Sequence, residues 1–173
     1  MSEAADLAEQ GHVDGLNVRL ANYGYEADGK AIVALLDAYA RDPMGGGEGL
    51  APAVQQRLAI ALDAFPGAFS VLAFAGAEPV GLANCFTGFS TFAARPLVNI
   101  HDLVVLSEHR GKGIGRALMN AVEAEARTRG ACKVTLEVLS GNAPAKALYT
   151  AQGFATYALD PDAGTAQFWE KKL

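Results

Sequence analysis

The feature that most constrains the fold of this chain is a cluster of glycines and basic residues between an apolar run and an amphipathic one. The segment Glu108–Ala126 reads EHRGKGIGRALMNAVEAEA and places a glycine at every second position from Gly111 to Gly115. Ordering glycine is entropically costly, so such a cluster indicates a backbone that must approach another group closely. The preceding residues Pro96–Leu106 are almost continuously apolar, which is typical of a central strand.

The residues after these glycines predict a helix whose first turn could bind phosphate. Apolar side chains from Ile114 to Val122 recur at helical spacing, and Gly130 ends the pattern. The first amides of a helix lack partners within it and the helix dipole adds positive potential there, to which Lys112 and Arg116 add formal charge. The segment lacks both the Lys-Ser or Lys-Thr pair of a Walker loop and the first, third and sixth glycines of a dinucleotide fingerprint. A phosphate site of another kind is therefore predicted.

The remaining pattern predicts an α/β chain with a mixed sheet and helices on both faces. Two apolar runs joined by a short turn form a hairpin, and one strand–helix–strand crossover follows it. The predicted segments are the strand 17–23, the helices 28–43 and 52–65, the strands 68–77, 79–89 and 96–106, the helix 114–130, the strand 132–139, the helix 142–154 and the closing strands 154–160 and 166–173. The length favours a single domain over residues 16–173 after a polar lead of residues 1–15.

Two segments together resemble the signatures of the GNAT superfamily of N-acetyltransferases. Arg110, Gly113 and Gly115 fit that family's acyl-CoA motif of Arg or Gln, two residues, Gly, one residue, and Gly or Ala. Asn142 and Tyr149 fit its second signature of Asn, several residues, Tyr and a closing Gly-Phe. The resemblance implies a central, mostly antiparallel sheet with one crossover, in which the strands before and after the loop helix splay apart.

The resemblance also implies the cosubstrate acetyl-CoA and a place for it. The pantetheine arm would hydrogen-bond to the first splayed strand like an added strand, and the diphosphate would lie on the loop amides. Asn142 would cap its helix and also bond to the cofactor arm. The implied cofactor-binding residues are Leu103, Val104, Val105, Arg110, Gly111, Lys112, Gly113, Ile114, Gly115, Arg116, Asn142 and Tyr149. The acceptor amine would attack the thioester directly, and no metal is implied.

Direct attack leaves two proton transfers for side chains. Tyr149 is the candidate general acid for the departing thiolate, with an ordinary core aromatic as the alternative. His101 is the candidate base, directly or through water, and a hydrogen-bonded core histidine is the alternative. Asp102 is expected to be a structural partner rather than a catalytic group, and Glu137 is a weaker candidate base.

Strand alternation predicts where the polar residues of the first splayed strand point. It assigns two faces: Asn99, His101, Leu103 and Val105 on one, and Ile100, Asp102 and Val104 on the other. The acceptor pocket is expected to be lined from the N-terminal third, by the loop between the first two helices, and by the hairpin. Candidates for an aromatic wall, or for plain core packing, are Tyr23, Tyr25, Phe86, Phe89 and Phe92. The glycine-rich residues 44–50 are either a mobile lid or slack chain.

These features favour an N-acetyltransferase acting on a primary amine of a small molecule. Acetylation of peptide or protein N-termini and a non-catalytic acyl-CoA sensor are the alternatives, and the presence of both His101 and Tyr149 favours an enzyme. A net charge of −5 argues against a nucleic-acid partner, and no apolar window suggests a membrane span. The acidic N-terminus lacks a secretory pattern, so a cytoplasmic location is expected, with a homodimer possible from family habit. Cys85 and Cys132 are expected to be reduced thiols rather than a disulfide or a metal pair.

Overall fold

The computed structural model describes residues 15–157, 160, 162, 164 and 166–173. The chain divides into two compact units, residues 1–136 and 137–173. Among the described residues, the first unit holds the sheet with the helices α1, α2 and α3, and the second holds the helix α4. The single domain expected over residues 16–173 stays a prediction.

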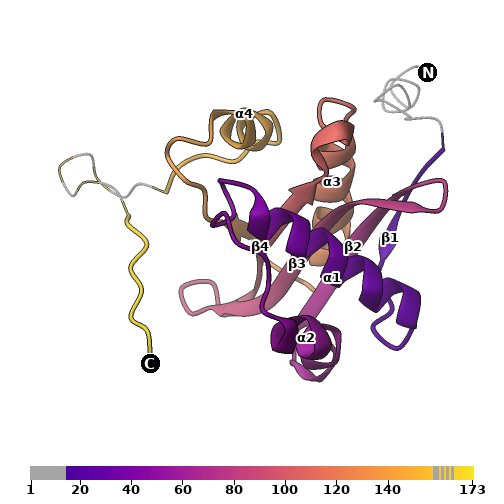
Figure 1. Ribbon diagram of the computed structural model, residues 1–173. Helices are drawn as coiled ribbons and strands as arrows, with labels where there is room; N and C mark the ends of the chain where they lie inside the picture. The colour runs from indigo at the N-terminus through magenta and orange to yellow at the C-terminus, as the bar shows by residue number, and fades with distance from the viewer. Residues whose placement is uncertain (1–14, 158–159, 161, 163, 165) are drawn as a thin grey trace, which may run out of the picture. The chain divides into compact units, whose positions relative to one another are not determined.

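The first unit is built on a five-stranded mixed sheet in the order β1-β2-β3-β4-β5 (Figure 1). The first four strands are antiparallel neighbours, whereas β5 pairs with β4 in parallel through a crossover that contains α3. The strands are β1 (Leu16–Leu20), β2 (Ala68–Ala75), β3 (Glu78–Ser90), β4 (Arg95–Val105) and β5 (Val134–Leu136). The predicted mixed sheet with one crossover is therefore confirmed.

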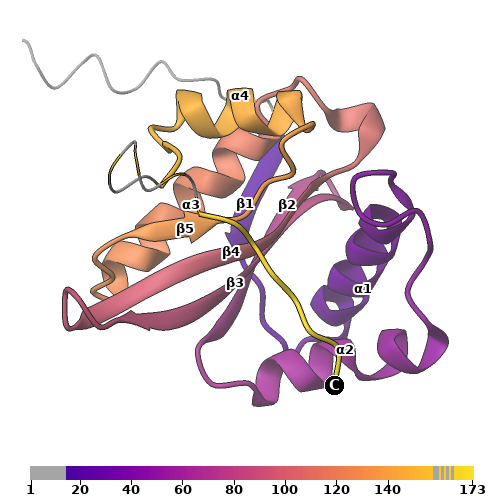
Figure 2. The ribbon, with the colours of Figure 1, turned by 90° about the vertical axis from the view of Figure 1, so that its left-hand side faces the viewer.

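Helices cover both faces of the sheet, as predicted. Figure 2 shows α1 and α2 on one face and α3 on the other. The bounds are α1 (Glu26–Arg41), α2 (Pro52–Ala64), α3 (Ile114–Thr128) and the short 3-10 helix η1 (Ser107–His109). Under α1, the buried side chains of Ile32 and Leu35 form a cluster with Leu72, Leu82 and Val104 of the sheet.

The packing of α3 depends on a glycine in β3. A Cβ atom at Gly81 would lie 3.0 Å from the Leu118 side chain and 3.1 Å from that of Ile114. Both side chains are buried, with 0% and 2% exposure. The missing side chain therefore lets the first turns of α3 lie close to the sheet, directly beyond the end of β4.

Strands β4 and β5 share only a short ladder. It runs from Val98 opposite Val134 to Ile100 opposite Leu136, while β4 continues to Val105. Strand β5 is three residues long, against the eight of the predicted strand 132–139. The far half of β4 therefore has one edge without a ladder partner in the part of the chain that the structure describes, which agrees with the predicted splay.

A β-bulge in β4 makes the predicted alternation of its side chains wrong. Asn84 and Cys85 are neighbours on β3, yet they lie opposite Asp102 and Ile100. His101 is thus the extra residue of the bulge. Because neighbouring positions on β3 face opposite sides, Ile100 and Asp102 also face opposite sides rather than the same one.

The bulge brings the polar residues of β4 to the face that carries α1 and α2. Phe86 lies two residues beyond Asn84 and opposite Asn99, so Asn99 and Asp102 share a face. The ring of His101 contacts Phe86 on that face. Strand alternation alone places His101 and Asp102 on opposite faces, but the residue that the bulge inserts shifts this alternation by one position.

The second unit contains α4 (Ala143–Ala151) and the C-terminal segment. Asn142 caps α4 by accepting a hydrogen bond from the Ala145 amide at 3.2 Å, and Gly153 follows the helix with φ +82°, as expected. Residues 154–157, 160 and 166–173 form no strand. The predicted closing strand pair is therefore absent from these described residues; a strand requires a hydrogen-bonded neighbour, which local apolar pattern does not supply.

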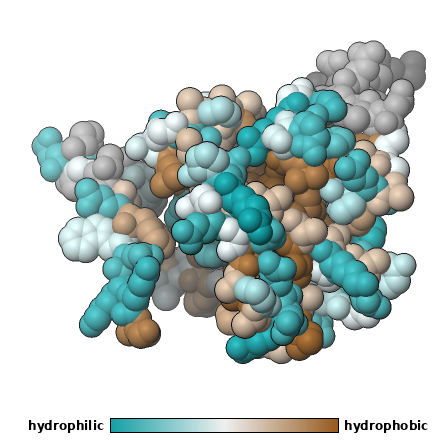
Figure 3. Space-filling view, in the orientation of Figure 1, coloured by the Kyte–Doolittle hydropathy of each residue, from teal (hydrophilic) through white to brown (hydrophobic). Residues whose placement is uncertain are grey.

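The surface of the first unit is mixed in character. The view in Figure 3 intersperses hydrophilic and hydrophobic residues, with hydrophobic atoms also near α2 at its lower edge. Val54, Ile60 and Phe65, in and just after α2, are exposed. None of the described helices is both long enough and apolar enough to cross a membrane.

Candidate active site

The glycine loop adopts a backbone that favours glycine at two positions. Gly111 has φ +76° and Gly113 has φ +80°, both in the left-handed region. A Cβ at Gly111 would meet nothing within 4 Å, and one at Gly113 would meet only the Arg116 guanidinium at 3.8 Å. The glycines are thus required by conformation rather than by crowding, and the space beside them is open to a ligand.

The N-terminus of α3 leaves hydrogen-bond donors without partners in the helix. Gly113 is its N-cap and supplies no side chain, and the first helical bond runs from the Ala117 amide to the Gly113 carbonyl at 3.0 Å. The amides of Ile114, Gly115 and Arg116 precede that bond and have no acceptor within the helix. Such a turn offers aligned donors and the positive end of a helix dipole to an anion.

Two of the three cations of the loop are free to reach a ligand. Lys112 and Arg116 are exposed, and neither forms an ion pair with another described residue. Together with the unpaired amides they make a strongly anion-attracting turn.

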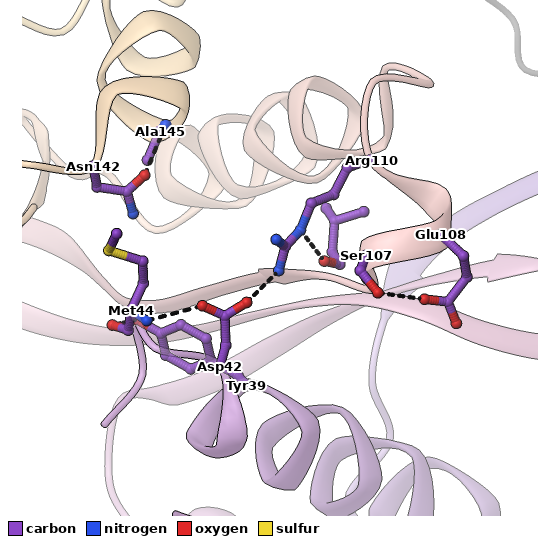
Figure 4. Close-up of polar contacts among 9 residues, drawn as sticks. Tyr39, Asp42, Met44, Ser107, Glu108, Arg110, Asn142 and Ala145 are labelled. Carbon is purple, nitrogen blue, oxygen red and sulfur yellow. Dashed lines mark hydrogen bonds and ion pairs between the residues drawn. The ribbon is translucent and has the colours of Figure 1, made fainter. Parts of the chain in front are cut away.

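Arg110 has a different environment, because its guanidinium binds protein atoms. Its Nε donates to the Val105 carbonyl at 3.0 Å, and a terminal nitrogen donates to the Asp42 carboxylate at 2.9 Å (Figure 4). The Arg110 guanidinium lowers the pKa of the Asp42 carboxyl, with help from the Met44 amide. Arg110 therefore joins the loop to the end of β4 and to the C-cap of α1.

Asp42 extends this link into the glycine-rich residues 44–50. Its second oxygen accepts from the Met44 amide at 2.9 Å, and the Met44 carbonyl accepts a long bond of 3.5 Å from the Tyr39 hydroxyl. At the far end, the Leu50 amide donates to Asp37 at 2.7 Å. The segment is thus anchored at both ends. Sequence reasoning missed Asp42, because its partner lies 68 residues away.

The edge of β4 between the bulge and the loop is where the family resemblance places the pantetheine arm. Leu103, Val104 and Val105 pair with β3 on one side, and no described strand pairs with them on the other. Backbone groups on an open strand edge can bond to an extended ligand by strand addition.

His101 lies at the start of this open edge. Its side chain is exposed, so the alternative of a core histidine is wrong. Its ring meets that of Phe86 edge to face, with centroids 5.6 Å apart and planes at 75°. Phe86 in turn meets Phe65 at 5.4 Å and 83°. These contacts orient the imidazole while leaving it accessible.

Asp102, the next residue, ends a chain of polar groups that crosses three strands. Its Oδ2 accepts from the Asn84 amide at 3.0 Å, and Asn84 Oδ1 accepts from the Ser70 hydroxyl at 2.6 Å. The Ser70 oxygen lies 2.9 Å from the Tyr23 hydroxyl. We call Tyr23, Ser70, Asn84 and Asp102 the polar chain. Sequence reasoning missed Ser70 and Asn84, although a polar residue within an apolar strand is the signal that could have identified both.

The structure brings together only part of the predicted aromatic wall. Tyr23 joins the polar chain and Phe86 contacts His101. Phe89 and Phe92 lie at the end of the β3–β4 hairpin and are 62% and 104% exposed. Tyr25, the N-cap of α1, is also exposed. Phe89 and Phe92 therefore neither pack in the core nor lie beside His101 in the strand register.

The remaining predicted residues belong to the second unit. Tyr149 is half-buried on α4, with its ring 6.1 Å from that of Phe154. Glu137, the first residue of this unit, is exposed. The roles of Tyr149, Asn142 and Glu137 in the reaction stay predictions.

The two cysteines are free thiols, as expected. Burial, followed by the charge of Asp102, raises the pKa of the Cys85 thiol to about 12, so this thiol is inert at neutral pH. Glu78, Glu108 and His109 bring their ligand-type atoms within 4.8 Å of one another at the surface. Exposed acidic groups commonly gather in this way without holding a metal ion.

Comparison with known proteins agrees with this arrangement. Residues 29–154 match the acetyltransferase (GNAT) family. A streptothricin acetyltransferase from Streptomyces lavendulae is 45% identical over 75 residues, which are 43% of this chain and 40% of that protein. The chain thus matches about two fifths of the length of this curated relative.

Solved structures share the fold at low sequence identity. An aminoglycoside acetyltransferase from an uncultured soil metagenomic sample superposes with a TM-score of 0.75 and 15% identity, covering 93% of this chain and 99% of that one. A ribosomal-protein-alanine N-acetyltransferase from Brucella melitensis biovar Abortus 2308 superposes with a TM-score of 0.63 and 19% identity, covering 84% and 98%. With the glycine loop, the open edge of β4 and the family match over most of its length, the chain belongs to the acetyltransferase (GNAT) family.

Proposed function

We propose that this protein is an acetyl-CoA-dependent N-acetyltransferase that acetylates a primary amine of a small molecule. The observation that carries the proposal is the junction of the open β4 edge with the unpaired amides of α3. The edge suits an extended arm that carries amides, and the helix turn suits a diphosphate at the end of that arm. Acetyl-CoA has both parts in this order.

The cosubstrate would be held mainly by backbone groups. Leu103, Val104 and Val105 would bond to the pantetheine arm, and the amides from Gly111 to Arg116 would bind the diphosphate. The Lys112 and Arg116 side chains would add charge, while Arg110 would position the loop. A backbone amide near the bulge would stabilise the negative oxygen that develops on the thioester carbonyl.

The transfer itself is a direct displacement at the thioester. The amine nitrogen bonds to the acetyl carbon, the carbon–sulfur bond breaks, and coenzyme A leaves as a thiolate. His101 would take the proton that the amine loses, directly or through water, and Tyr149 would give a proton to the thiolate. The products are an N-acetylated amine and coenzyme A.

A small-molecule acceptor is favoured over a peptide by the curated relative that is 45% identical over 75 residues. That relative is a streptothricin acetyltransferase, whereas the ribosomal-protein-alanine N-acetyltransferase shares the fold at 19% identity. The non-catalytic sensor is disfavoured by the exposed imidazole of His101 at the open strand edge, since binding alone requires no base there. Cytoplasmic location and a homodimer stay predictions.

Thiol release from acetyl-CoA tests the proposal. The purified protein is mixed with acetyl-CoA and, in separate reactions, with streptothricin, sisomicin and a short peptide that begins with alanine. We expect release with streptothricin or sisomicin and none above background with the peptide. Release with the peptide alone would establish the alternative acceptor. Stabilisation by coenzyme A without release in any reaction would establish the sensor.

A further inference from the structure

Asp102 is a half-buried carboxylate without a cationic partner among the described residues. Another buried acid of the same unit, Asp28, does have a cationic partner. Asp28 is 1% exposed and receives two hydrogen bonds from the Arg19 guanidinium, at 2.6 and 2.7 Å, and one from the Asn22 amide at 2.8 Å. Withdrawing a carboxylate from water is costly unless an opposite charge compensates it. Asp28 has that compensation within the fold and Asp102 does not.

The polar chain holds Asp102 in one orientation. An ionised carboxylate only accepts hydrogen bonds, so the Asn84 amide must donate to it through Nδ2 and must receive the Ser70 hydroxyl at Oδ1. The Ser70 hydrogen is then used, and the Tyr23 hydroxyl donates to the Ser70 oxygen. Every donor in the chain therefore points toward Asp102.

The chain is also rigid, because its middle lies inside the sheet. Ser70 is 1% exposed and Asn84 is 2% exposed, on neighbouring strands. Buried polar groups lower the stability of the fold unless each of them forms its hydrogen bonds. The groups of the polar chain form theirs only in this one arrangement. The carboxylate at its end is half-buried, so one end of a rigid buried structure is presented toward solvent.

The charge of Asp102 reaches its neighbours on both packed elements. On α1, burial and then the charges of Asp102 and Asp42 raise the pKa of the Tyr39 hydroxyl. On β3, burial and then Asp102 raise the pKa of the Cys85 thiol, while Arg129 acts in the opposite direction. The charge of Asp102 therefore acts on groups of both α1 and β3.

We propose that Asp102 binds an ammonium group of the acceptor, and that Tyr23, Ser70 and Asn84 are positioning residues that aim it. The inference rests on the proposed function and names the acceptor class as a cationic amine. Asp102 is adjacent to His101 and to the open β4 edge, so a cation held there would lie beside the thioester. The bound ammonium would supply the missing opposite charge.

Neutralising the carboxylate tests the proposal. In Asp102→Asn we expect the KM for the acceptor that the wild type acetylates, streptothricin or sisomicin, to rise roughly tenfold or more, because a partly desolvated charge pair is lost. The stabilisation by coenzyme A should stay as in the wild type. Asp63→Asn is the matched control, since Asp63 is exposed on α2 and should leave the KM unchanged.

The possible results separate this inference from the proposed function. An unchanged KM in Asp102→Asn, or a loss in kcat alone, would overturn the ammonium role while wild-type thiol release still supports the proposed function. If the wild type releases no thiol with either streptothricin or sisomicin, the proposed function fails and the inference fails with it.

Shortening the polar chain tests the positioning residues. In Ser70→Ala the Asn84 amide loses the group that orients it, and we expect the acceptor KM to rise about threefold to tenfold at similar kcat. Ser70→Thr keeps the hydroxyl and should restore the KM. If Ser70→Ala does not fold, Tyr23→Phe provides the same test at the half-buried end of the chain, with a smaller rise expected. A lowered melting temperature with an unchanged acceptor KM would mean a purely structural role and would overturn this part.

Discussion

Single residues decide the chemistry of the glycine loop through their backbone conformations. Gly111 and Gly113 have positive φ angles with open space around them, so the loop turns sharply and exposes the first amides of α3. The placement of His101 is also set by the backbone, because the bulge inserts this residue between two paired positions of β4. The sequence identified these residues as candidates for the site, but it did not predict the direction of the His101 side chain.

We expect Gly113→Val to abolish the rise in melting temperature caused by coenzyme A. A β-branched residue is strained at φ +80°, so the N-cap would rearrange and misplace the amides of Ile114 and Gly115. Gly130→Val is the matched control at the other end of α3, with φ +70° and open space. It should lower the melting temperature by a similar amount while keeping the response to coenzyme A. A full response in Gly113→Val would exclude the loop as the diphosphate site.

We expect His101→Ala to flatten the acidic limb of the pH profile of kcat/KM. A base must be unprotonated to accept the proton of the amine, so the wild-type rate should fall on the acidic side. His109→Ala on η1 is the control and should keep the wild-type limb. An acidic limb that persists in His101→Ala would assign the base to water or to another group.

At the scale of elements, ion pairs and hydrogen bonds fasten helices to the sheet around the site. The Arg19–Asp28 pair joins β1 to the first turn of α1, and the Arg110–Asp42 pair joins the glycine loop to the end of that helix. Helix α1 is therefore held at both ends, next to residues 44–50. Helical spacing predicted α1, but it could not predict either ion pair, because the paired residues are too far apart in the sequence for a pattern based on neighbouring positions.

We expect Asp28→Asn to lower the free energy of unfolding by about 3 kcal/mol at pH 7, because it leaves a partly buried arginine without its charge partner. The hydrogen bonds from Arg19 are the main cause that lowers the pKa of the Asp28 carboxyl below its ordinary value of 3.8. A lowered pKa stabilises the fold above the ordinary pKa, and this contribution is lost as the pH falls through the folded-state value.

Urea unfolding at several pH values measures both effects. The wild type should lose stability as the pH falls below about 4, and Asp28→Asn should lose less over the same interval. Glu123→Gln, which breaks an exposed pair with Arg127 on α3, should change the free energy of unfolding by less than about 0.5 kcal/mol. Equal slopes for wild type and Asp28→Asn would contradict the assignment.

At the scale of the whole molecule, the residues proposed for the reaction are distributed over both units. The first unit supplies the loop, the open strand edge, His101 and the polar chain. The second contains Asn142, the N-cap of α4, and Tyr149 within α4, whose roles stay predictions. The family match over residues 29–154 includes parts of both.

We expect Tyr149→Phe to lower kcat roughly a hundredfold with little change in the affinity for acetyl-CoA, because a general acid acts on the departing thiolate. Tyr157→Phe, at an exposed position of the same unit, should behave like the wild type. Turnover and the Kd for acetyl-CoA are measured separately for each variant. An equal loss in both for Tyr149→Phe would make this residue a cofactor ligand instead.

The amino-acid sequence alone determined the order of most elements, the glycine loop and the family, because each of these depends on neighbours within a few residues. Helical spacing predicted α1, α2 and α3, and an almost continuously apolar run predicted β4. The same local patterns overestimated the length of β5 and predicted closing strands that the described residues lack.

Only the tertiary structure decided which polar groups meet. The bulge at His101 turned Asp102 toward Asn84, and packing across three strands joined Asn84 to Ser70 and Tyr23. Likewise, Asp42 reached Arg110 across 68 positions. Register and long-range contacts arise from pairing between distant segments, and a one-residue shift reverses every side chain that follows it.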